Sequence, residues 1–387
     1  MHCVDRSDLL PSPEAAAHSR QVTRLIQSQI EKAGGWIDFA RFMELCLYAP
    51  GLGYYAGGAA KFGRAGDFVT APEVSPLFGQ TVAQQVGDVL RRTGGDVLEL
   101  GAGSGALARD LLLALRETGP LPERYLILEA SAELRERQQE QLRGLPDALA
   151  SRVSWLDGLP AWHEGLILGN ELLDSLPVHL VCWREGAIYE RGVTVHADGF
   201  AWEERPLRDG RLARAARRLP LQAPYLSEIN LAAPALIRTL AALLRRGAIL
   251  FVDYGFGERE YYHPQRSSGT LMCHYRQRAH DDPFFAPGLQ DITAHVDFTA
   301  VAHAGVEAGL DLLGYTTQAQ FLINLGITDR LAQVPAAEVA AYVPRAAGVQ
   351  KLLSPSEMGE LFKAIALGRA VPGPLRGFGH GDKSRLL

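Results

Sequence analysis

The chain has 387 residues, of which 47% are hydrophobic and 21% are charged, and its formal net charge is −5. This composition is typical of a folded protein with a core, and the length predicts two domains or one large domain with insertions. The negative charge argues against nucleic acid or a membrane as partner, and no apolar run is long enough to predict a membrane-spanning helix.

Cysteine usage and the first residues indicate a cellular compartment. The four cysteines include no CxxC pair, which argues against a disulfide framework and against a cysteine-based zinc site. The N-terminal segment carries Asp5, Asp8 and Glu14 and has no apolar stretch of signal-peptide length. We therefore expect a cytoplasmic protein with reduced thiols and no metal.

The N-terminal region, residues 1–92, is predicted to consist of helices and one glycine-rich loop. Hydrophobic spacing predicts helices over residues 14–33, 39–48 and 76–91. Residues 51–73 are too rich in glycine for a regular element, but their tyrosines and phenylalanines indicate an ordered loop.

This loop contains candidate cofactor contacts. Gly66, Asp67 and Thr70 lie in its second half, and the loop would have to fold back over the sheet that follows it in the sequence. We expect it to close a cofactor pocket, with Asp67 or Thr70 making polar contacts. The alternative is that both side chains only stabilise a turn.

Residues 93–177 and 245–320 alternate strands with helices. Buried strands are predicted over residues 96–100, 125–131, 152–158, 165–174 and 246–255. This alternation indicates βαβ units and a parallel sheet, that is, a Rossmann-like α/β domain.

The other regions depart from that pattern. Residues 178–244 contain three runs of period-two alternation separated by Glu-Gly and Asp-Gly pairs, which predict an inserted set of antiparallel hairpins followed by a helix. Residues 256–298 are predicted to form a long irregular loop. Residues 321–387 are predicted to be a helical C-terminal extension.

The strongest motif is the segment from Glu99 to Gly105, ELGAGSG, between a predicted strand and a predicted helix. Its glycines, Gly101, Gly103 and Gly105, permit a sharp turn that brings backbone N–H groups and the helix N-terminus against a ligand. A glycine turn alone is a weak signal, and its position after a strand strengthens the prediction.

The spacing of this turn distinguishes between nucleotide-like ligands. A dinucleotide site expects G-x-G-x-x-G, whereas this turn has G-x-G-x-G, and the carboxylate of Glu99 would repel a pyrophosphate. An acidic residue there suits the cationic methionine end of S-adenosylmethionine. Glu129 ends the second strand and is a candidate for the ribose hydroxyls, and Asp157 ends the third strand and is a weaker candidate for the adenine amino group. A solvated strand-end carboxylate is the alternative for Glu129.

Five segments together resemble the MidA-like family of S-adenosylmethionine-dependent methyltransferases. They are GDFVTAPEVSPLFG (66–79), ELGAGSG (99–105), NELLDSLPV (170–178), FVDYG (251–255) and PGLQDITAHVDF (287–298). The resemblance implies a class I methyltransferase fold. Mitochondrial members of the family are complex I assembly factors and protein arginine methyltransferases, but the resemblance does not supply a substrate.

Asn170 and Glu171 close the fourth predicted strand, where open α/β sheets bind their ligands. The resemblance places this position opposite the reactive methyl group and makes both residues catalytic candidates, with Asn170 also contacting the cofactor. A guanidinium stays protonated, so Glu171 and Asp174 are candidates to orient it and accept its proton. The alternative is that Asn170 caps a helix and Glu171 is solvated.

The segment QDITAHVDF is predicted to form a strand with four polar residues on one face, namely Asp291, Thr293, His295 and Asp297. We take His295 as a catalytic candidate on a substrate-binding or proton-accepting face. A hydrogen-bonded structural network is an equal alternative, and a metal site is the weaker one.

The sequence favours a methyltransferase acting on a protein side chain, with arginine as the leading acceptor. A small-molecule methyltransferase and an assembly scaffold without turnover remain alternatives, and an NAD-linked oxidoreductase is the weakest. The oligomeric state is left open, a homodimer included.

Overall fold

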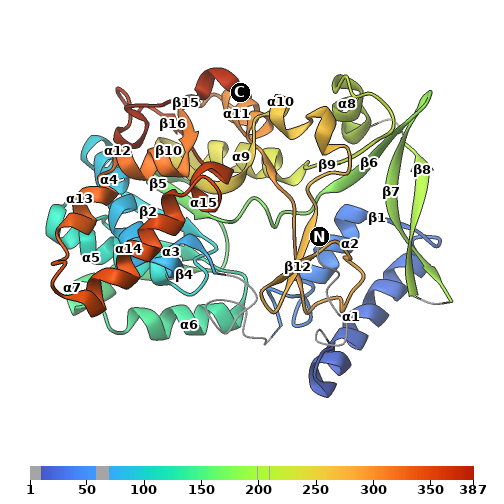
Figure 1. The fold of residues 1–387 in the computed structure, drawn as a ribbon, viewed down its shortest axis with the longest axis horizontal. Coiled ribbons are helices and arrows are strands. Elements are labelled where there is room, and N and C mark those ends of the chain that lie inside the picture. The colour runs from blue at the N-terminus through green and yellow to red at the C-terminus, as the bar shows by residue number, and fades with distance from the viewer. Residues whose placement is uncertain (1–9, 58–68, 198, 209) are drawn as a thin grey trace. The chain divides into compact units, whose positions relative to one another are not determined.

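The computed structural model describes residues 10–57, 69–197, 199–208 and 210–387, which form two compact units (Figure 1). We call Val69–Leu173, Pro234–Glu258 and Val296–Leu387 the parallel-sheet unit. The remainder, Met1–Phe68, Asp174–Ala233 and Arg259–His295, is the antiparallel-sheet unit. The chain passes between the units several times, so these boundaries differ from the domain boundaries predicted above.

The parallel-sheet unit contains an eight-stranded sheet with the order β15-β16-β10-β5-β2-β3-β4, and β14 pairs with β10. The strands from β4 to β10 are parallel, and β16 runs antiparallel to both of its neighbours. Their bounds are β2 Asp96–Leu100, β3 Tyr125–Leu128, β4 Val153–Leu156, β5 His163–Asn170, β10 Leu244–Phe256, β14 Val296–Asp297, β15 Asp311–Thr317 and β16 Phe362–Arg369. The predicted α/β class is confirmed.

Helices of this unit pack around the sheet. Every residue of β2 is buried, as expected for a parallel strand covered on both faces. Phe78 of α4 and Leu111 of α5 belong to the same apolar core as Leu166 of β5. The helices are α3 Ala71–Val74, α4 Pro76–Thr93, α5 Ala106–Thr118, α6 Ala132–Leu142, α7 Asp147–Ala150, α9 Ala232–Leu243, α11 Phe298–Glu307, α12 Gln318–Asn324, α13 Ile327–Ala332, α14 Val339–Leu353 and α15 Met358–Leu361.

The prediction that residues 321–387 form a helical extension is wrong, because β16 lies inside the sheet between β10 and β15. Its sequence, FKAIALGR, contains good helix formers such as alanine and leucine. Pairing on both sides and burial in the sheet override that local preference.

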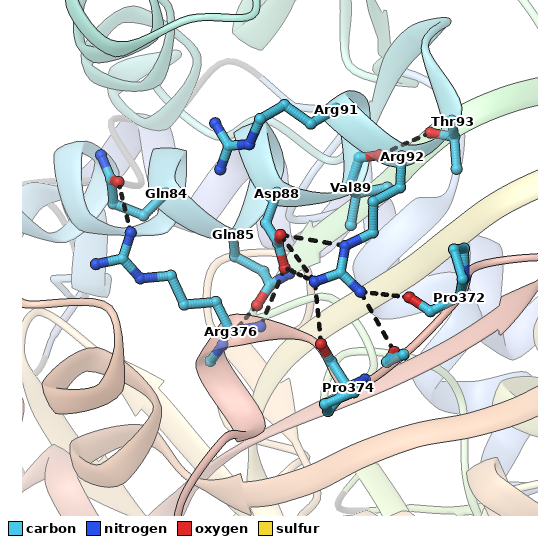
Figure 2. A network of polar contacts seen from close by, with 12 residues as sticks. Gln84, Gln85, Asp88, Val89, Arg91, Arg92, Thr93, Pro372, Pro374 and Arg376 are labelled. Carbon is cyan, nitrogen blue, oxygen red and sulfur yellow. Dashed lines mark hydrogen bonds and ion pairs between the residues drawn. The ribbon is translucent and has the colours of Figure 1, made fainter.

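A polar network attaches the segment after β16 to α4 (Figure 2). Arg92 donates to Asp88 one turn earlier and to the carbonyl oxygens of Pro372 and Pro374. The backbone N–H of Arg376 donates to the same Asp88 carboxylate at 3.1 Å. The end of the chain is therefore part of this unit's structure.

The antiparallel-sheet unit contains a sheet with the order β1-β7-β6-β9, with β8 paired to β7. Strands β6, β7 and β8 lie where the hairpins are predicted, whereas β1 and β9 join them from sequence that gave no strand signal. The bounds are β1 Ile37–Asp38, β6 His179–Arg184, β7 Ala187–His196, β8 Gly199–Pro206 and β9 Tyr225–Ile229, with helices α1 Pro13–Lys32, α2 Phe39–Tyr48 and α8 Arg211–Arg218.

The predicted irregular loop contains a small sheet. Its strand order is β12-β11-β13, and it forms the second sheet of the antiparallel-sheet unit. The bounds are α10 Glu258–Tyr261, β11 Met272–Tyr275, β12 Arg278–His280 and β13 Asp291–Thr293, with a short 3₁₀ turn at Pro264–Arg266. Two further 3₁₀ turns, Arg376–Phe378 and Ser384–Leu386, belong to the parallel-sheet unit. Strand β13 lies inside the predicted strand segment QDITAHVDF, whereas β11 and β12 are too short for periodicity to reveal them.

Two further observations bear on the predictions from composition. Within the described residues no helix is long and apolar enough to cross a membrane. Cys46, Cys182 and Cys273 are buried free thiols.

Candidate active site

The glycine turn between β2 and α5 adopts a backbone that other residues rarely adopt. Gly101, Gly103 and Gly105 have φ values of 65°, 54° and 84°. A Cβ atom on Gly105 would lie 3.3 Å from the Cα atom of Gln138. The turn therefore requires glycine, and it presents backbone at the N-terminus of α5, where a ligand can accept hydrogen bonds.

Glu99 is a buried carboxylate at the end of β2, with an exposed fraction of 2%. The Tyr125 hydroxyl donates to its Oε2 atom at 2.7 Å. Burial raises the pKa of Glu99 to about 7. The hydrogen bond from Tyr125 opposes this shift, and the charge of the nearby Glu129 adds a smaller increase. Because this one hydrogen bond only partly compensates the buried charge, a cationic ligand group would stabilise the charged form, as predicted for the methionine end of the cofactor.

Glu129 follows β3 and is held in place on both oxygens. Its Oε1 accepts from the Ser131 N–H at 2.9 Å, and its Oε2 accepts from Gln138 Nε2 at 3.0 Å. The same Gln138 nitrogen donates to the Gly103 carbonyl oxygen at 3.0 Å, and Gln138 Oε1 accepts from Trp155 Nε1 at 2.9 Å. Gln138 thus ties Glu129 to the glycine turn, a role that the sequence did not reveal.

Asp157 lies beyond the end of β4 with 91% of its side chain exposed, and it forms an ion pair with Arg135 at 2.7 Å. An exposed pair of this kind contributes only about 0–1 kcal/mol, so it does not prevent the carboxylate from binding a ligand. The adenine role of Asp157 stays a prediction.

Asn170 ends β5, and Glu171 begins a strained turn with φ at 50°. For a residue other than glycine this conformation costs about 1–2 kcal/mol. Three contacts hold Glu171 there: its N–H donates to the Val252 oxygen at 2.9 Å, and its Oε1 accepts from the Ala71 N–H at 2.9 Å and from Asn170 Nδ2 at 3.0 Å.

The rest of this turn is held by β10. Asp253 is fully buried, and its Oδ2 accepts from the N–H groups of Leu172 and Leu173 at 3.0 and 2.7 Å. Sequence reasoning gave Asp253 no role, although its place in the FVDYG segment at the end of a strand was a usable signal. A strained backbone that neighbouring segments hold in place by hydrogen bonds is typical of functional positions.

One polar atom of the Asn170 side chain has no hydrogen-bond partner among the described residues. Its Nδ2 donates to Glu171, whereas its Oδ1 is buried and has no hydrogen-bond partner among the described residues. Buried oxygens are normally paired, so this acceptor fits a position that faces a bound ligand.

The glycine-rich loop is described only in part. Gly66 and Asp67 lie outside the described residues. Thr70 is half-buried at the N-cap of α3, and its side chain makes no capping hydrogen bond. The following N–H, of Ala71, donates to Glu171 instead, which places this segment of the loop beside the predicted catalytic pair.

Asp174 and His295 belong to the antiparallel-sheet unit. Asp174 is buried, and its backbone oxygen accepts from the Ala294 N–H at 3.0 Å. The His295 N–H donates to Thr270 Oγ1 at 3.1 Å, and Thr270 in turn donates to the buried carboxylate of Glu228. The structure thus links the backbones of Asp174 and of the His295 segment.

The prediction that Asp291, Thr293, His295 and Asp297 share one strand face is wrong. Strand β13 ends at Thr293, and β14 begins at Val296 and pairs with β10 in the other unit. The alternation breaks because the Ala294 N–H bonds to Asp174 rather than to a sheet neighbour.

Asp297 instead caps α11, accepting from the N–H groups of Thr299 and Ala300 at 3.0 and 3.2 Å. Its pKa is raised to about 7, mainly by burial and then by the charge of Glu258, while the capping bonds oppose the shift. The role of Asp297 in the fold is therefore that of a helix cap.

Strand order and glycine turn define the class of this protein. The turn follows the central strand β2, the strands beside it are parallel, and an antiparallel strand enters between β10 and β15. Such sheets bind ligands at the carboxyl ends of their strands, where Glu99, Glu129 and Asn170 all lie. This is a class I methyltransferase, and its cofactor is S-adenosylmethionine.

Comparison with known proteins identifies the family. The sequence profile of a family of S-adenosyl-L-methionine-dependent methyltransferases matches residues 77–316, and the chain belongs to this family. A protein from Burkholderia thailandensis, solved with S-adenosyl-homocysteine bound, is similar with a TM-score of 0.95 and 50% identity, over 98% of this chain and 99% of that chain.

Two curated relatives are more distant. The mitochondrial protein arginine methyltransferase NDUFAF7 homolog of Drosophila melanogaster is 29% identical over 92% of this chain and 87% of its own length. Mitochondrial protein arginine methyltransferase NDUFAF7 of Mus musculus is 29% identical over 94% of this chain and 89% of its own length.

Proposed function

We propose that this methyltransferase transfers its methyl group to an arginine side chain of a protein. The observation that carries the proposal is the arrangement of Asn170 and Glu171 at the carboxyl end of β5, with one buried amide oxygen left for a donor. The names of the curated relatives, protein arginine methyltransferases matched over most of their length, support the same acceptor.

An arginine acceptor makes a specific demand on the site. The guanidinium carries five N–H donors and stays protonated at neutral pH, so an enzyme has to offer it acceptors and a place for the proton that leaves. Asn170 Oδ1 supplies a fixed acceptor, because Glu171 holds the amide group by its nitrogen. Glu171 is therefore a positioning residue in this proposal, and Asp174 and His295 are the candidates to accept the proton.

The remaining residues hold the cofactor. When bound, S-adenosylmethionine supplies an already activated methyl group, and the protein mainly has to hold donor and acceptor in line. The glycine turn would contact it with backbone groups, and Glu99 and Glu129 would carry the carboxylates that bind its methionine and ribose parts. Gln138 keeps Glu129 and the turn together.

The test is isotope labelling. The purified chain is incubated with S-adenosylmethionine carrying a trideuterated methyl group and an extract of its source cells, and labelled arginines are sought by peptide mass spectrometry. We expect labelled methylarginine in one or a few proteins. An Asn170→Ala variant that still binds S-adenosyl-homocysteine is the matched control and should give about 100-fold less label in the same time.

Each alternative has its own outcome in this experiment. Label confined to small molecules would replace the protein acceptor by a small-molecule one. Absence of any label, with cofactor binding intact, would favour an assembly scaffold without turnover. The cytoplasmic location and the homodimer both stay predictions, and the curated relatives are mitochondrial proteins by name.

A further inference from the structure

The antiparallel-sheet unit contains a cavity of about 350 Å³ that holds none of the residues discussed so far. It lies between the β6–β7 hairpin and α8. The apolar side chains of Trp183, Ile188, Leu207 and Leu221 line it together with the arginines Arg184 and Arg217. Pockets that bind small groups typically have volumes of about 300–1,000 Å³, so this one can hold a single large side chain.

Arginines of α8 and of the turn before it surround this region. Arg217 lines the cavity itself. Arg208, Arg211, Arg214 and Arg218 are exposed, and within the described part of the chain none of these four makes an ion pair. Segment 205–218 has six arginines and a single acidic residue, Asp209. We call these four exposed arginines, Arg208, Arg211, Arg214 and Arg218, the arginine face.

The arginines on the neighbouring strands behave differently. Arg184 and Arg191 both donate to Glu204, each at 2.7 Å. Their guanidinium groups lower the pKa of Glu204 to about 2. This unit pairs its strand arginines with a carboxylate, whereas Arg208, Arg211, Arg214 and Arg218 form no ion pair among the described residues.

The wall of the cavity also contains a donor without an acceptor. Trp183 is buried to 95%, since its exposed fraction is 5%, and its Nε1 has no hydrogen-bond partner among the described residues. Buried donors are nearly always paired, because an unpaired one loses the hydrogen bond it would make in water. The Trp183 N–H group therefore needs a hydrogen-bond acceptor from a group bound beside this wall.

We propose that the cavity and the arginine face bind an acidic polypeptide segment of a partner protein, with one apolar side chain of that segment in the cavity. Guanidinium groups bind carboxylates through two parallel hydrogen bonds, which matches the exposed arginines to aspartate and glutamate. The apolar walls match a side chain such as leucine, the kind of buried anchor on which protein interfaces depend.

Two other anionic partners fit these observations less well. Single-stranded nucleic acid binds through aromatic side chains that stack on bases, and α8, with the sequence RLARAARR, has none. A membrane-binding helix needs an apolar face free to insert, whereas Leu212, Ala213 and Ala216 of α8 are buried in the protein. An acidic peptide uses both the charge and the cavity.

The test uses a labelled peptide and a matched pair of double variants of the full chain. The probe is fluorescein-labelled Asp-Glu-Asp-Leu-Glu-Asp-Glu, measured by anisotropy. Arg214→Glu/Arg218→Glu should weaken its binding about tenfold or more, because close charge pairs at interfaces couple strongly. The control, Arg20→Glu/Arg24→Glu on α1, changes the same charge at the same helical spacing on exposed positions and should stay within about twofold.

Two further measurements locate the peptide. Replacing its leucine by serine should weaken binding about tenfold, because the apolar burial is lost. The indole N–H resonance of Trp183, assigned by its absence in Trp183→Phe, should shift at saturating peptide. A resonance that does not move would remove the cavity from the proposal.

Other outcomes overturn the proposal outright. They are no binding of the peptide, equal weakening by both double variants, or tighter binding of a uridine oligonucleotide or of phosphatidylserine vesicles with the same dependence on Arg214 and Arg218. None of these measurements involves methyl transfer, so failure here is distinct from failure of the proposed function.

Discussion

Glu99 in the parallel-sheet unit and Glu228 in the antiparallel-sheet unit are both buried carboxylates, with exposed fractions of 2% and 1%. Glu99 accepts one hydrogen bond among the described residues, from the Tyr125 hydroxyl. Glu228 accepts from four groups, the N–H groups of Thr270 and Leu271 and the hydroxyls of Thr270 and Tyr261. The same type of side chain thus accepts hydrogen bonds from one donor group in the parallel-sheet unit and from four in the antiparallel-sheet unit.

The difference indicates two uses of a buried charge. A carboxylate with many fixed donors ties loops together and needs nothing further. A carboxylate with one donor is costly in its charged form, and it gains most when a ligand brings a positive group. The comparison therefore predicts that changes at the edge of the parallel sheet affect ligand binding and chemistry, whereas changes at Glu228 affect stability.

The largest expected effect is at the glycine turn. Gly103→Val places a branched side chain at a φ of 54°, where such residues are strongly disfavoured, and fills space beside the ligand. We expect the affinity for S-adenosyl-homocysteine to fall by about 1,000-fold or more, that is, by about 4 kcal/mol. Calorimetric titration measures the change.

The matched control is Gly144→Val, because Gly144 is exposed and a Cβ atom there would meet nothing within 4 Å. This variant should bind as the unchanged protein does. If Gly103→Val also keeps its affinity, the turn does not contact the cofactor and the comparison loses its basis.

The second effect concerns catalysis at the end of β5. Asn170→Ala removes the buried amide oxygen, and we expect kcat to fall about 100-fold, as when one fixed donor or acceptor is lost from an active site. Affinity for S-adenosyl-homocysteine should change less than about threefold. The rate is measured with the acceptor found by isotope labelling.

Glu171→Gln sharpens this test. Because Glu171 acts by holding Asn170, we expect a loss of about tenfold in the single variant and no additional loss when it is combined with Asn170→Ala. Additive losses would mean that Glu171 contacts the substrate itself and is a catalytic residue.

The third effect is on stability, in the other unit. Glu228→Gln replaces an acceptor oxygen by an amide N–H₂ group among donors, and we expect a loss of about 2–4 kcal/mol in the free energy of unfolding. Urea denaturation measures it, and Glu185→Gln at the exposed β6–β7 turn should change little. Cofactor affinity that fell along with stability would contradict the division of roles between the two carboxylates.

The sequence predicted the parts of the fold that local pattern determines. Helix α2, for example, has the predicted bounds, 39–48, because its apolar spacing and its Asp38 N-cap are both local. The glycine turn and the Asn170–Glu171 pair were found in the same way, since each directly follows a buried strand.

Residues whose role depends on distant contacts were missed. Gln138 meets the Gly103 carbonyl oxygen across 35 residues of sequence, and Glu228 meets Thr270 across 42. Strand β16 was predicted as helix because only pairing with β10 and β15 makes it a strand. The aligned polar face at 291–297 failed because the chain leaves one sheet and joins another within it.

The smallest expected effect is a pH dependence that comes from Glu99. Its pKa of about 7 lies above the ordinary value of 4.5, so its contribution to stability is fully present below pH 4.5 and is lost as the pH rises to about 7. Cofactor binding should have the opposite sign, because only the ionised carboxylate attracts a cationic group. Between pH 6 and pH 8 we expect the affinity for S-adenosyl-homocysteine to rise by about three- to tenfold.

Glu99→Gln provides the comparison, since it keeps the shape and the bond from Tyr125 but cannot ionise. Its affinity should be flat over the same pH range, and its binding should release no proton when calorimetry is repeated at pH 6.5 in buffers of different ionisation enthalpy. The unchanged protein should release a fraction of a proton under these conditions, because a cation beside Glu99 lowers its pKa. A pH profile identical in both proteins would mean that the Glu99 carboxylate does not face the ligand. The number of hydrogen-bond donors would then not distinguish the role of Glu99 from that of Glu228.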